Sequence, residues 1–194
     1  MAEIVLFHHV QGKTSGVTDL AAALEAAGHT VHVPDLLDGH TFASIDEGVA
    51  FVEELGFGTI IERGEAAAAA VPADVVYIGI SLGVLPAQKL AQSREGARGA
   101  VFFASCVPTS EFGDGWPPGV PVLIHGMDND PFFAGEGDID AARALVAGVG
   151  ADGDAELIVY PGDGHLFIDS SVEAYDADAA AEALSRTLDF LARI

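Results

Sequence analysis

Short hydrophobic runs alternate with amphipathic segments along the whole chain, and this alternation predicts the fold class. The runs are rich in Val, Ile and Phe, and Gly, Pro or polar residues follow them. This pattern is typical of strands that are buried on both faces of a parallel sheet. We predict strands at residues 3–10, 30–33, 75–80, 99–105, 120–125 and 155–160.

The segments between these runs repeat hydrophobic residues at helical spacing. We predict helices at residues 18–27, 44–55, 59–71, 82–93, 138–147 and 173–193. Ser44 and Glu47 have the spacing of a capping box, and Asp138 is expected to be the N-cap of its helix. Because strands and helices alternate, we expect an α/β protein with a mainly parallel sheet, helices on both faces and right-handed crossovers.

The clearest local signal lies in residues 75–91. A β-branched run ends at Ser81, which lies between Gly79 and Gly83, and a helical pattern follows at once. In a G-x-S-x-G turn the serine adopts a strained conformation at the carboxyl end of a strand, and the glycines leave room for neighbouring backbone. The amide of Leu82 would then face the position of an oxyanion. The pattern predicts a nucleophile, although an ordinary glycine-rich turn can have the same five letters.

Polar residues follow several of the other predicted strands, where ligands bind in parallel sheets. Ser81, Asp130 and His165 occur in the Ser, Asp, His order of hydrolases of this architecture. A serine hydroxyl needs a base to become a nucleophile, and an imidazole that is oriented by a buried carboxylate can supply one. Asp128 is the main alternative to Asp130, because both lie in a sequence that also favours a turn.

Composition narrows the class of protein further. We expect one domain, residues 1–194, because a chain of 194 residues can bury one large core. The formal net charge of −22 makes nucleic acid and anionic membranes improbable partners. No hydrophobic run is long enough to span a bilayer, and the single cysteine, Cys106, fits a reducing compartment, so we expect a cytoplasmic protein.

Two further groups of residues have more than one interpretation. The adjacent histidines His8 and His9 would point to opposite faces of a strand, so we expect no metal site there. The aromatic residues Trp116 and Phe132 are either packing residues or an apolar wall for a substrate. Cys106 is expected to be a small buried hydrophobic residue.

Three segments resemble the catalytic motifs of the dienelactone hydrolase family, within the α/β-hydrolase superfamily. They are residues 79–83 (GISLG), 125–133 (HGMDNDPFF) and 160–167 (YPGDGHLF). The resemblance covers nearly the whole chain and implies an α/β-hydrolase fold without a cap domain, since no long insertion separates the strands. It implies that Asp130 is the acid of the triad and that the amides of Val10 and Leu82 form the oxyanion hole.

The chain departs from this family at two positions. The namesake enzymes carry a cysteine at the position of Ser81 and a glutamate at the position of His9. We therefore expect a serine-nucleophile variant that acts on a small-molecule ester or lactone other than dienelactone. His9 is expected to border the oxyanion hole and to contact the substrate.

These observations together predict a serine hydrolase that works through an acyl-enzyme and needs no cofactor. A different class also fits the sequence: a non-catalytic ligand-binding module that keeps the fold and its pocket. The sequence indicates no particular oligomeric state.

Overall fold

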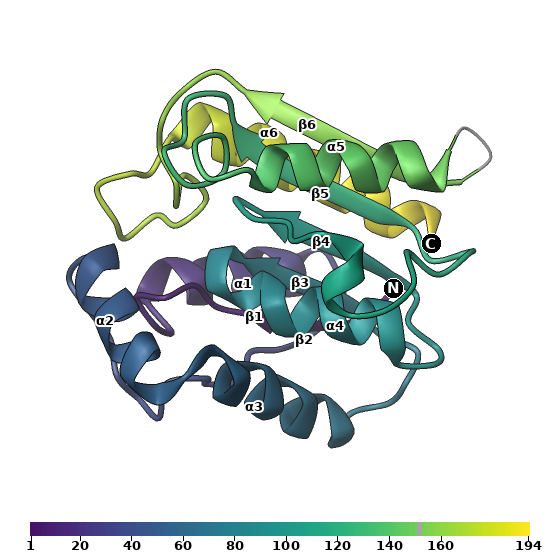
Figure 1. The fold of residues 1–194 in the computed structure, drawn as a ribbon, viewed down its shortest axis with the longest axis horizontal. Helices are drawn as coiled ribbons and strands as arrows, with labels where there is room; N and C mark the ends of the chain where they lie inside the picture. Colours follow the sequence, from purple (N-terminus) through teal and green to yellow (C-terminus); the bar gives the residue numbers. More distant parts are fainter. Residues whose placement is uncertain (151–152) are drawn as a thin grey trace.

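The computed structural model describes residues 1–150 and 153–194, and its centre is a six-stranded sheet (Figure 1). The strands are β1 (Glu3–Phe7), β2 (Thr30–His32), β3 (Val76–Ile80), β4 (Gly99–Phe103), β5 (Val122–Met127) and β6 (Ala155–Tyr160). Their order in the sheet is β2-β1-β3-β4-β5-β6, and every neighbouring pair is parallel. The carboxyl ends of all six strands therefore lie along one edge, as the alternating pattern predicts.

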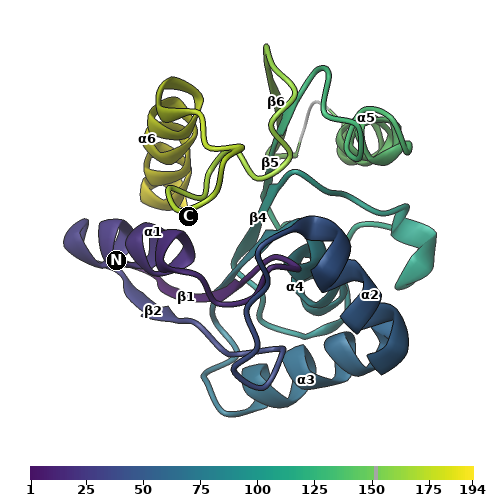
Figure 2. The same ribbon diagram turned by 90° about the vertical axis from the view of Figure 1, so that its left-hand side faces the viewer.

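Helices cover both faces of this sheet (Figure 2). They are α1 (Ser15–Ala26), α2 (Ile45–Leu55), α3 (Phe57–Ala69), α4 (Val84–Ser93), α5 (Asp138–Val149) and α6 (Ala177–Arg193), with short 3₁₀ helices η1 (Ser81–Gly83) and η2 (Thr109–Glu111). Helices α1 and α6 cover one face, and α3, α4 and α5 cover the other. This is the predicted arrangement of an α/β-hydrolase fold, and no cap domain covers the strand ends within the described ranges.

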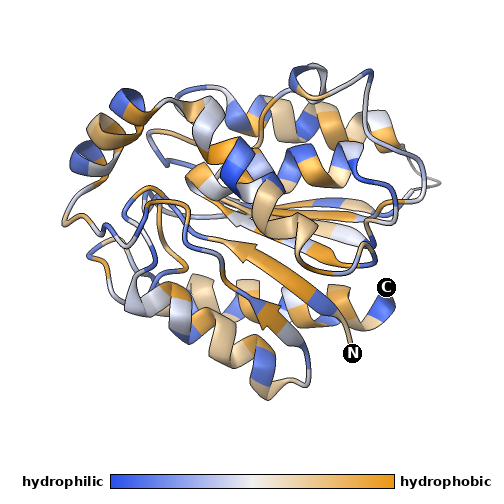
Figure 3. Cartoon of the chain, turned by 90° about the horizontal axis from the view of Figure 1, so that it is seen from below, coloured by the Kyte–Doolittle hydropathy of each residue, from blue (hydrophilic) through white to orange (hydrophobic). Residues whose placement is uncertain are grey.

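Alternation of side chains along each strand divides the core into two layers. In β1, Ile4 and Leu6 pack under α1 and α6, whereas Val5 and Phe7 pack on the opposite face. All four side chains are buried. The strands are coloured mainly as hydrophobic, with a few hydrophilic positions, whereas hydrophobic and hydrophilic residues alternate along the helices (Figure 3). Two-sided burial explains why the strands appear in the sequence as continuous hydrophobic runs. No helix of the described residues is long and apolar enough to cross a membrane.

Strand β2 ends one residue earlier than the sequence pattern predicts, at His32, and two other strands end two or three residues earlier. Strand β1 ends at Phe7 instead of residue 10, because the buried rings of His8 and His9 bind loop atoms and the chain turns there. Strand β4 ends at Phe103 instead of residue 105, because Ala104 has a positive φ of 58°. In both cases the residues after the last strand residue form loop at the carboxyl edge of the sheet.

The helix starts also differ in part from the prediction. Ser44 caps α2 as expected, and its hydroxyl accepts a hydrogen bond from the Glu47 N–H. Asp138 is the first residue of α5 and not its N-cap, because Gly137 takes the cap position with a φ of 103°. Helix α6 begins at Ala177 instead of residue 173, after Asp176 has capped its first turn.

His125 of β5 provides a test of the core through pH. Burial, with a smaller effect from Arg186, lowers the pKa of His125 from 6.5 to about 3. Between these values the unfolded chain binds a proton that the folded chain does not. The free energy of unfolding should therefore fall by about 1.4 kcal/mol per pH unit from this group as the pH drops from 6 to 4. The free energy of unfolding of His125→Phe should be measured by urea denaturation at several pH values. Its change per pH unit should be smaller than that of the wild type by this amount.

The matched control is Tyr160→Phe. The Tyr160 hydroxyl lies 3.0 Å from His125 Nδ1, so this variant removes the same hydrogen bond and keeps the titrating ring. Its free energy of unfolding should be lower at all pH values, but should change with pH as steeply as that of the wild type. If the stability of His125→Phe depended on pH as steeply as that of the wild type, buried His125 would not be the source of this pH dependence.

Candidate active site

Ser81 lies at the sharp turn between β3 and α4, at the carboxyl edge of the sheet. Its φ is 49°, a left-handed conformation that is unusual for a residue with a side chain. A Cβ at Gly79 would lie 2.6 Å from the carbonyl oxygen of Gly83, and a Cβ at Gly83 would overlap the carbonyl of Phe7. Glycine is thus required at both positions by close backbone contacts, as the five-residue pattern predicts.

A chain of hydrogen bonds links the Ser81 side chain to two residues from distant loops. The Ser81 hydroxyl lies 2.7 Å from Nε2 of His165, which follows β6. The Nδ1–H of the same ring donates to Oδ2 of Asp130, which follows β5, over 2.8 Å. The Asp130 and His165 residues are 1% and 7% exposed. In such an arrangement an imidazole can take the proton of an alcohol while a carboxylate holds the ring in place.

The two candidate aspartates after β5 have different surroundings. The second oxygen of Asp130 accepts the Phe132 N–H over 2.9 Å, so both carboxylate oxygens are bound within the site. Asp128 is exposed, and its Oδ1 accepts the N–H of Gly162 over 3.0 Å. The structure therefore brings Asp130 to His165, whereas Asp128 joins two loops at the surface.

Val10 and Leu82, whose backbone amides the sequence suggests as oxyanion donors, both lie at the cavity that contains Ser81. Val10 follows β1 and Leu82 is in η1, and both line the cavity next to Ser81 and His165. The N–H of Val10 donates to no protein acceptor among the described residues. The first N–H groups of a helix likewise have no acceptor within the helix, which applies to Leu82. Free N–H groups at a cavity wall can stabilise a developing negative charge.

The cavity that contains Ser81 has a volume of about 210 Å³. Most of its wall is apolar, and five polar side chains interrupt it: two hydroxyls, two carboxylates and one imidazole. The lining residues are Val10, Ile45, Val49, Phe57, Ser81, Leu82, Leu85, Ala104, Ser105, Phe132, Glu136, Asp138 and His165. The Phe132 ring lies against the His165 ring, with 4.6 Å between the centroids. No Lys or Arg of the described residues lines this cavity.

A protein-family model matches residues 1–194 and describes the dienelactone hydrolase family. The chain belongs to the dienelactone hydrolase family. The sequence resemblance that predicts this family from three motifs is thus confirmed over the full length. Members are hydrolases, which is the class of enzyme that this membership supports.

Solved structures of other proteins have the same fold. A dienelactone hydrolase-like promiscuous phosphotriesterase from metagenomic libraries superposes with a TM-score of 0.74 at 18% identity, covering 100% of this chain and 86% of that chain. A cold-adapted esterase from an Arctic intertidal metagenomic library gives 0.68 at 19%, covering 98% and 81%. The mouse alpha/beta hydrolase domain-containing protein 10 gives 0.70 at 11%, covering 98% and 90%. A search of curated proteins gave no match.

Two residues that the sequence suggests for substrate contact do not line this cavity. His9 has no exposed surface, and its Nε2–H donates to Asp169 over 2.6 Å. Trp116 donates its indole N–H to the carbonyl of Val120 and packs edge-on against Phe102, away from Ser81. Of the three suggested contact residues, only Phe132 reaches the cavity in this member of the family.

The side chains of His8 and Cys106 are buried inside the protein. Burial, opposed in part by a hydrogen bond to the His9 carbonyl, lowers the pKa of His8 to about 4, so the ring is neutral and can accept the Leu36 N–H. Burial raises the pKa of the Cys106 thiol to about 12, and the nearby Asp138 carboxylate adds to this. No group of three or more His, Cys, Asp or Glu side chains able to hold a metal ion exists in the described part of the chain.

Several cavity residues could not be found from motifs. Ile45 and Val49 of α2 and Phe57 of α3 reach the cavity because α2 lies over the carboxyl edge of the sheet. In the sequence they are ordinary members of helical apolar patterns. Glu136 and Asp138 precede and begin α5, where acidic residues are common because they favour helix starts.

The close contacts at the serine turn give a stability prediction. Gly83→Ala should lower the free energy of unfolding by about 3 kcal/mol or more, because its Cβ would overlap the backbone of Phe7, which cannot rotate away. Gly148→Ala is the control, since this exposed glycine in α5 has open space around it. It should raise the stability by about 0.5 to 1 kcal/mol. Chemical denaturation measures the free energy of unfolding of both variants. Equal changes in the two would contradict the prediction.

Proposed function

We propose that this protein is a serine hydrolase that cleaves a small carboxylic ester or lactone through an acyl-enzyme. The observation that carries the proposal is the hydrogen-bonded series of Ser81, His165 and Asp130 at a strained turn beside a cavity. Membership of a hydrolase family supports it.

The proposed reaction has two half-reactions with one base. Ser81 Oγ attacks the substrate carbonyl carbon, and its proton passes to His165 Nε2. The tetrahedral intermediate collapses when the C–O bond to the leaving alkoxide breaks, and His165 returns the proton to that oxygen. A water molecule then gives a proton to His165 and attacks the acyl carbonyl, and Ser81 leaves with the proton. Asp130 keeps the ring oriented and stabilises the imidazolium in both steps.

In both half-reactions a negative charge develops on the former carbonyl oxygen. The N–H groups of Val10 and Leu82 are the proposed donors to this oxygen. Their support is that the Val10 N–H, at the cavity wall, donates to no acceptor in the described part of the chain, and that Leu82 lies at the start of η1. Donors that are already in place stabilise the intermediate without reorganisation during the reaction.

The cavity supports a small, uncharged acyl group. The cavity is small, about 210 Å³, and its walls from α2, α3 and α4 are apolar. Glu136 and Asp138 add negative charge at the cavity, with no Lys or Arg of the described residues to offset it. An anionic substrate, such as a lactone that carries a carboxylate, would be repelled there.

The decisive experiment for the reaction is covalent labelling. A fluorophosphonate probe should label the wild type and not Ser81→Ala, because only the serine hydroxyl can displace fluoride from phosphorus. Hydrolysis of p-nitrophenyl butyrate should fall by about 10³-fold or more in Ser81→Ala, His165→Ala and Asp130→Ala. A wild type that takes no label and turns over no ester, while a ligand binds equally well to Ser81→Ala, would instead support a binding module.

Charge selection by the cavity gives a second test. The wild type should hydrolyse p-nitrophenyl butyrate with a kcat/KM about tenfold higher than that for the p-nitrophenyl monoester of succinic acid, which adds a carboxylate. Glu136→Gln should narrow this ratio, and so should 1 M NaCl, because Glu136 is exposed and its field is screened.

Glu95→Gln is the matched control for this test. It makes the same change of charge at an exposed residue beyond the end of α4, on the opposite edge of the sheet. It should leave the ratio of the two kcat/KM values unchanged. Equal narrowing by Glu95→Gln and Glu136→Gln would attribute the selectivity to the net charge of the protein instead of the cavity.

A further inference from the structure

A second buried histidine–carboxylate pair lies next to the amide of Val10. His9 Nε2 and Asp169 Oδ2 are 2.6 Å apart, and neither side chain has any exposed surface. His9 immediately precedes Val10, and Asp169 lies in the loop that follows His165. The pair therefore joins the segment that carries a proposed oxyanion donor to the segment that carries the proposed base.

The hydrogen bonds of His9 determine which nitrogen carries its proton. The N–H of Gln11 donates to His9 Nδ1 over 3.2 Å, so this nitrogen is an acceptor. Nε2 must then carry the proton and donate it to Asp169. Because the ring holds the Gln11 N–H, it fixes the peptide that follows Val10, and the Val10 N–H is left without a protein acceptor among the described residues.

Asp169 is itself held on both carboxylate oxygens. Oδ2 also accepts from the Thr14 hydroxyl over 2.5 Å, and Oδ1 accepts from the Ser171 N–H over 2.8 Å and from the Ser171 hydroxyl over 2.6 Å. Burial alone would raise the pKa of Asp169, but the hydrogen bonds from His9, Ser171 and Thr14 outweigh it and hold the pKa well below its ordinary value. The carboxylate stays ionised and is a strong acceptor for His9.

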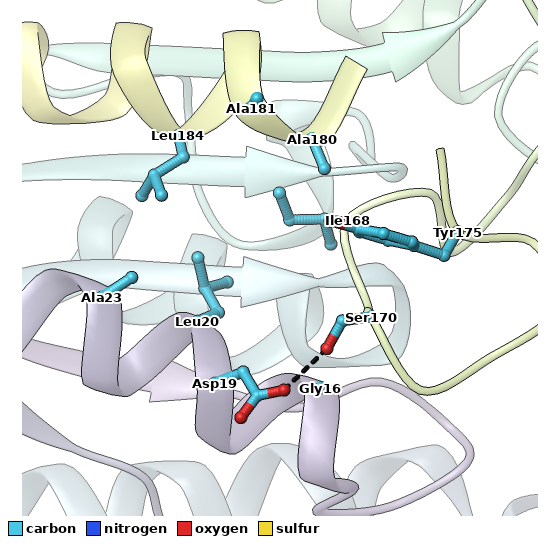
Figure 4. Close-up of a pocket in the computed structure, with 10 residues that line it drawn as sticks. All are labelled: Gly16, Asp19, Leu20, Ala23, Ile168, Ser170, Tyr175, Ala180, Ala181 and Leu184. Atoms are coloured by element: carbon cyan, nitrogen blue, oxygen red, sulfur yellow. Dashed lines mark hydrogen bonds between the residues drawn. The ribbon is translucent and has the colours of Figure 1, made fainter. Parts of the chain in front are cut away.

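The N-terminus of α1 supports the same carboxylate. Thr14 is the N-cap of α1, so its hydroxyl accepts from the Val17 N–H while it donates to Asp169. A Cβ at Gly16 would overlap the Asp169 carboxylate, so the helix start can approach this closely only with glycine there. Figure 4 shows the adjoining part of the loop, where the Ser170 hydroxyl donates to Asp19 of α1 over 2.8 Å. The positive end of the α1 dipole therefore faces the carboxylate.

Other contacts restrain the residues on the far side of Val10. The Phe42 N–H donates to the Gln11 carbonyl over 3.0 Å, and the Gln11 side-chain amide donates to the Phe42 carbonyl over 3.1 Å. Gly48 of α2 lies against the Val10 carbonyl, where a Cβ would overlap it. The carbonyl side of Val10 is thus fixed by α2, and the segment around its amide is fixed by His9.

We propose that His9 and Asp169 are positioning residues, which act as one unit to keep the Val10 N–H directed at the developing oxyanion. This inference rests on the proposed function. His9 does not line the substrate cavity, and its ring bonds Asp169 and the Gln11 N–H, so its effect passes through the backbone around Val10. The shared loop also means that displacement of Asp169 disturbs the oxyanion hole and the base together.

The test compares His9→Phe, Asp169→Asn and the double variant by steady-state kinetics with p-nitrophenyl butyrate. Each single variant should lower kcat by about 10-fold to 100-fold, which is no more than the decrease in kcat expected when an oxyanion donor is removed completely. The KM should stay within about twofold of the wild-type value. The double variant should lose no more than the worse single variant, because the two residues act as a unit. Ser171→Ala removes one of the two hydroxyls that donate to Asp169 and should give a smaller loss of kcat. Because Ser171 is an exposed residue, this variant should stay folded.

Thr187→Val is the control for a purely structural effect. Thr187 is buried on α6 beside His125, at 3.3 Å from Nε2, so its loss also weakens the contacts of a buried histidine. It should lower the free energy of unfolding while leaving kcat unchanged. If Thr187→Val lowers kcat as much as His9→Phe at similar stability loss, or if all the His9 and Asp169 variants keep the kcat of the wild type, the proposal is overturned.

A measurement that needs no turnover separates this inference from the proposed function. Amide hydrogen exchange in peptides that cover residues 8–14 should be faster in His9→Phe and Asp169→Asn than in the wild type and Thr187→Val. Unchanged exchange would overturn the positioning role even in an active enzyme. An inactive, unlabelled wild type whose 8–14 segment still loosens in these variants would overturn the hydrolase assignment and leave the restraint of the Val10 segment supported.

Discussion

The close contact between the serine turn and the end of β1 is the constraint on which the rest of the site depends. Gly83 abuts the backbone of Phe7, and Gly79 abuts the backbone of Gly83, so the turn is pressed against the neighbouring strand. This contact holds Ser81 in a left-handed conformation, and it also places the segment after β1 beside η1. The positions of the proposed nucleophile and of both proposed oxyanion donors thus depend on glycine at residues 79 and 83.

Two buried histidine–carboxylate pairs lie near the serine turn, one at the cavity and one behind the Val10 segment. In each pair one ring nitrogen donates to a buried aspartate, Asp130 for His165 and Asp169 for His9. The remaining nitrogen of His165 faces a hydroxyl, whereas that of His9 accepts a backbone N–H. A ring that faces a hydroxyl can move a proton, and a ring that accepts a backbone N–H can only hold the chain. The partner of the other ring nitrogen therefore determines whether the histidine can transfer a proton or restrains the backbone.

Much of the fold could be predicted from sequence because buried parallel strands leave a strong local signal. Strand β6 has the predicted bounds, and Ser44 caps α2 as expected. The end of β1 was not predictable in this way, because the partners that draw His8 and His9 out of the sheet are the Leu36 amide and Asp169 in distant loops. Hydrophobic periodicity carries no information about such loop contacts.

The candidate site shows the same division between local and distant signals. Ser81 has a five-residue pattern with a steric cause, so it could be located from sequence. The local turn sequence left Asp128 as an alternative to Asp130, and the family resemblance implied Asp130. In the structure it is the buried Asp130 that bonds His165, whereas Asp128 is exposed and bonds Gly162. Trp116 was suggested by its place in a long loop, but its indole N–H is satisfied within that loop by Val120. Loop composition alone does not tell which way an aromatic ring points.

The burial of Cys106 has a practical consequence for labelling the protein. It is the single cysteine of the chain, and with a pKa of about 12 it carries almost no thiolate at neutral pH. Maleimides and iodoacetamides react with thiolates, so the native protein should remain almost unmodified by them. A cysteine introduced anywhere on the surface would thus be the sole attachment point for a spin label or fluorophore, without removal of the natural one.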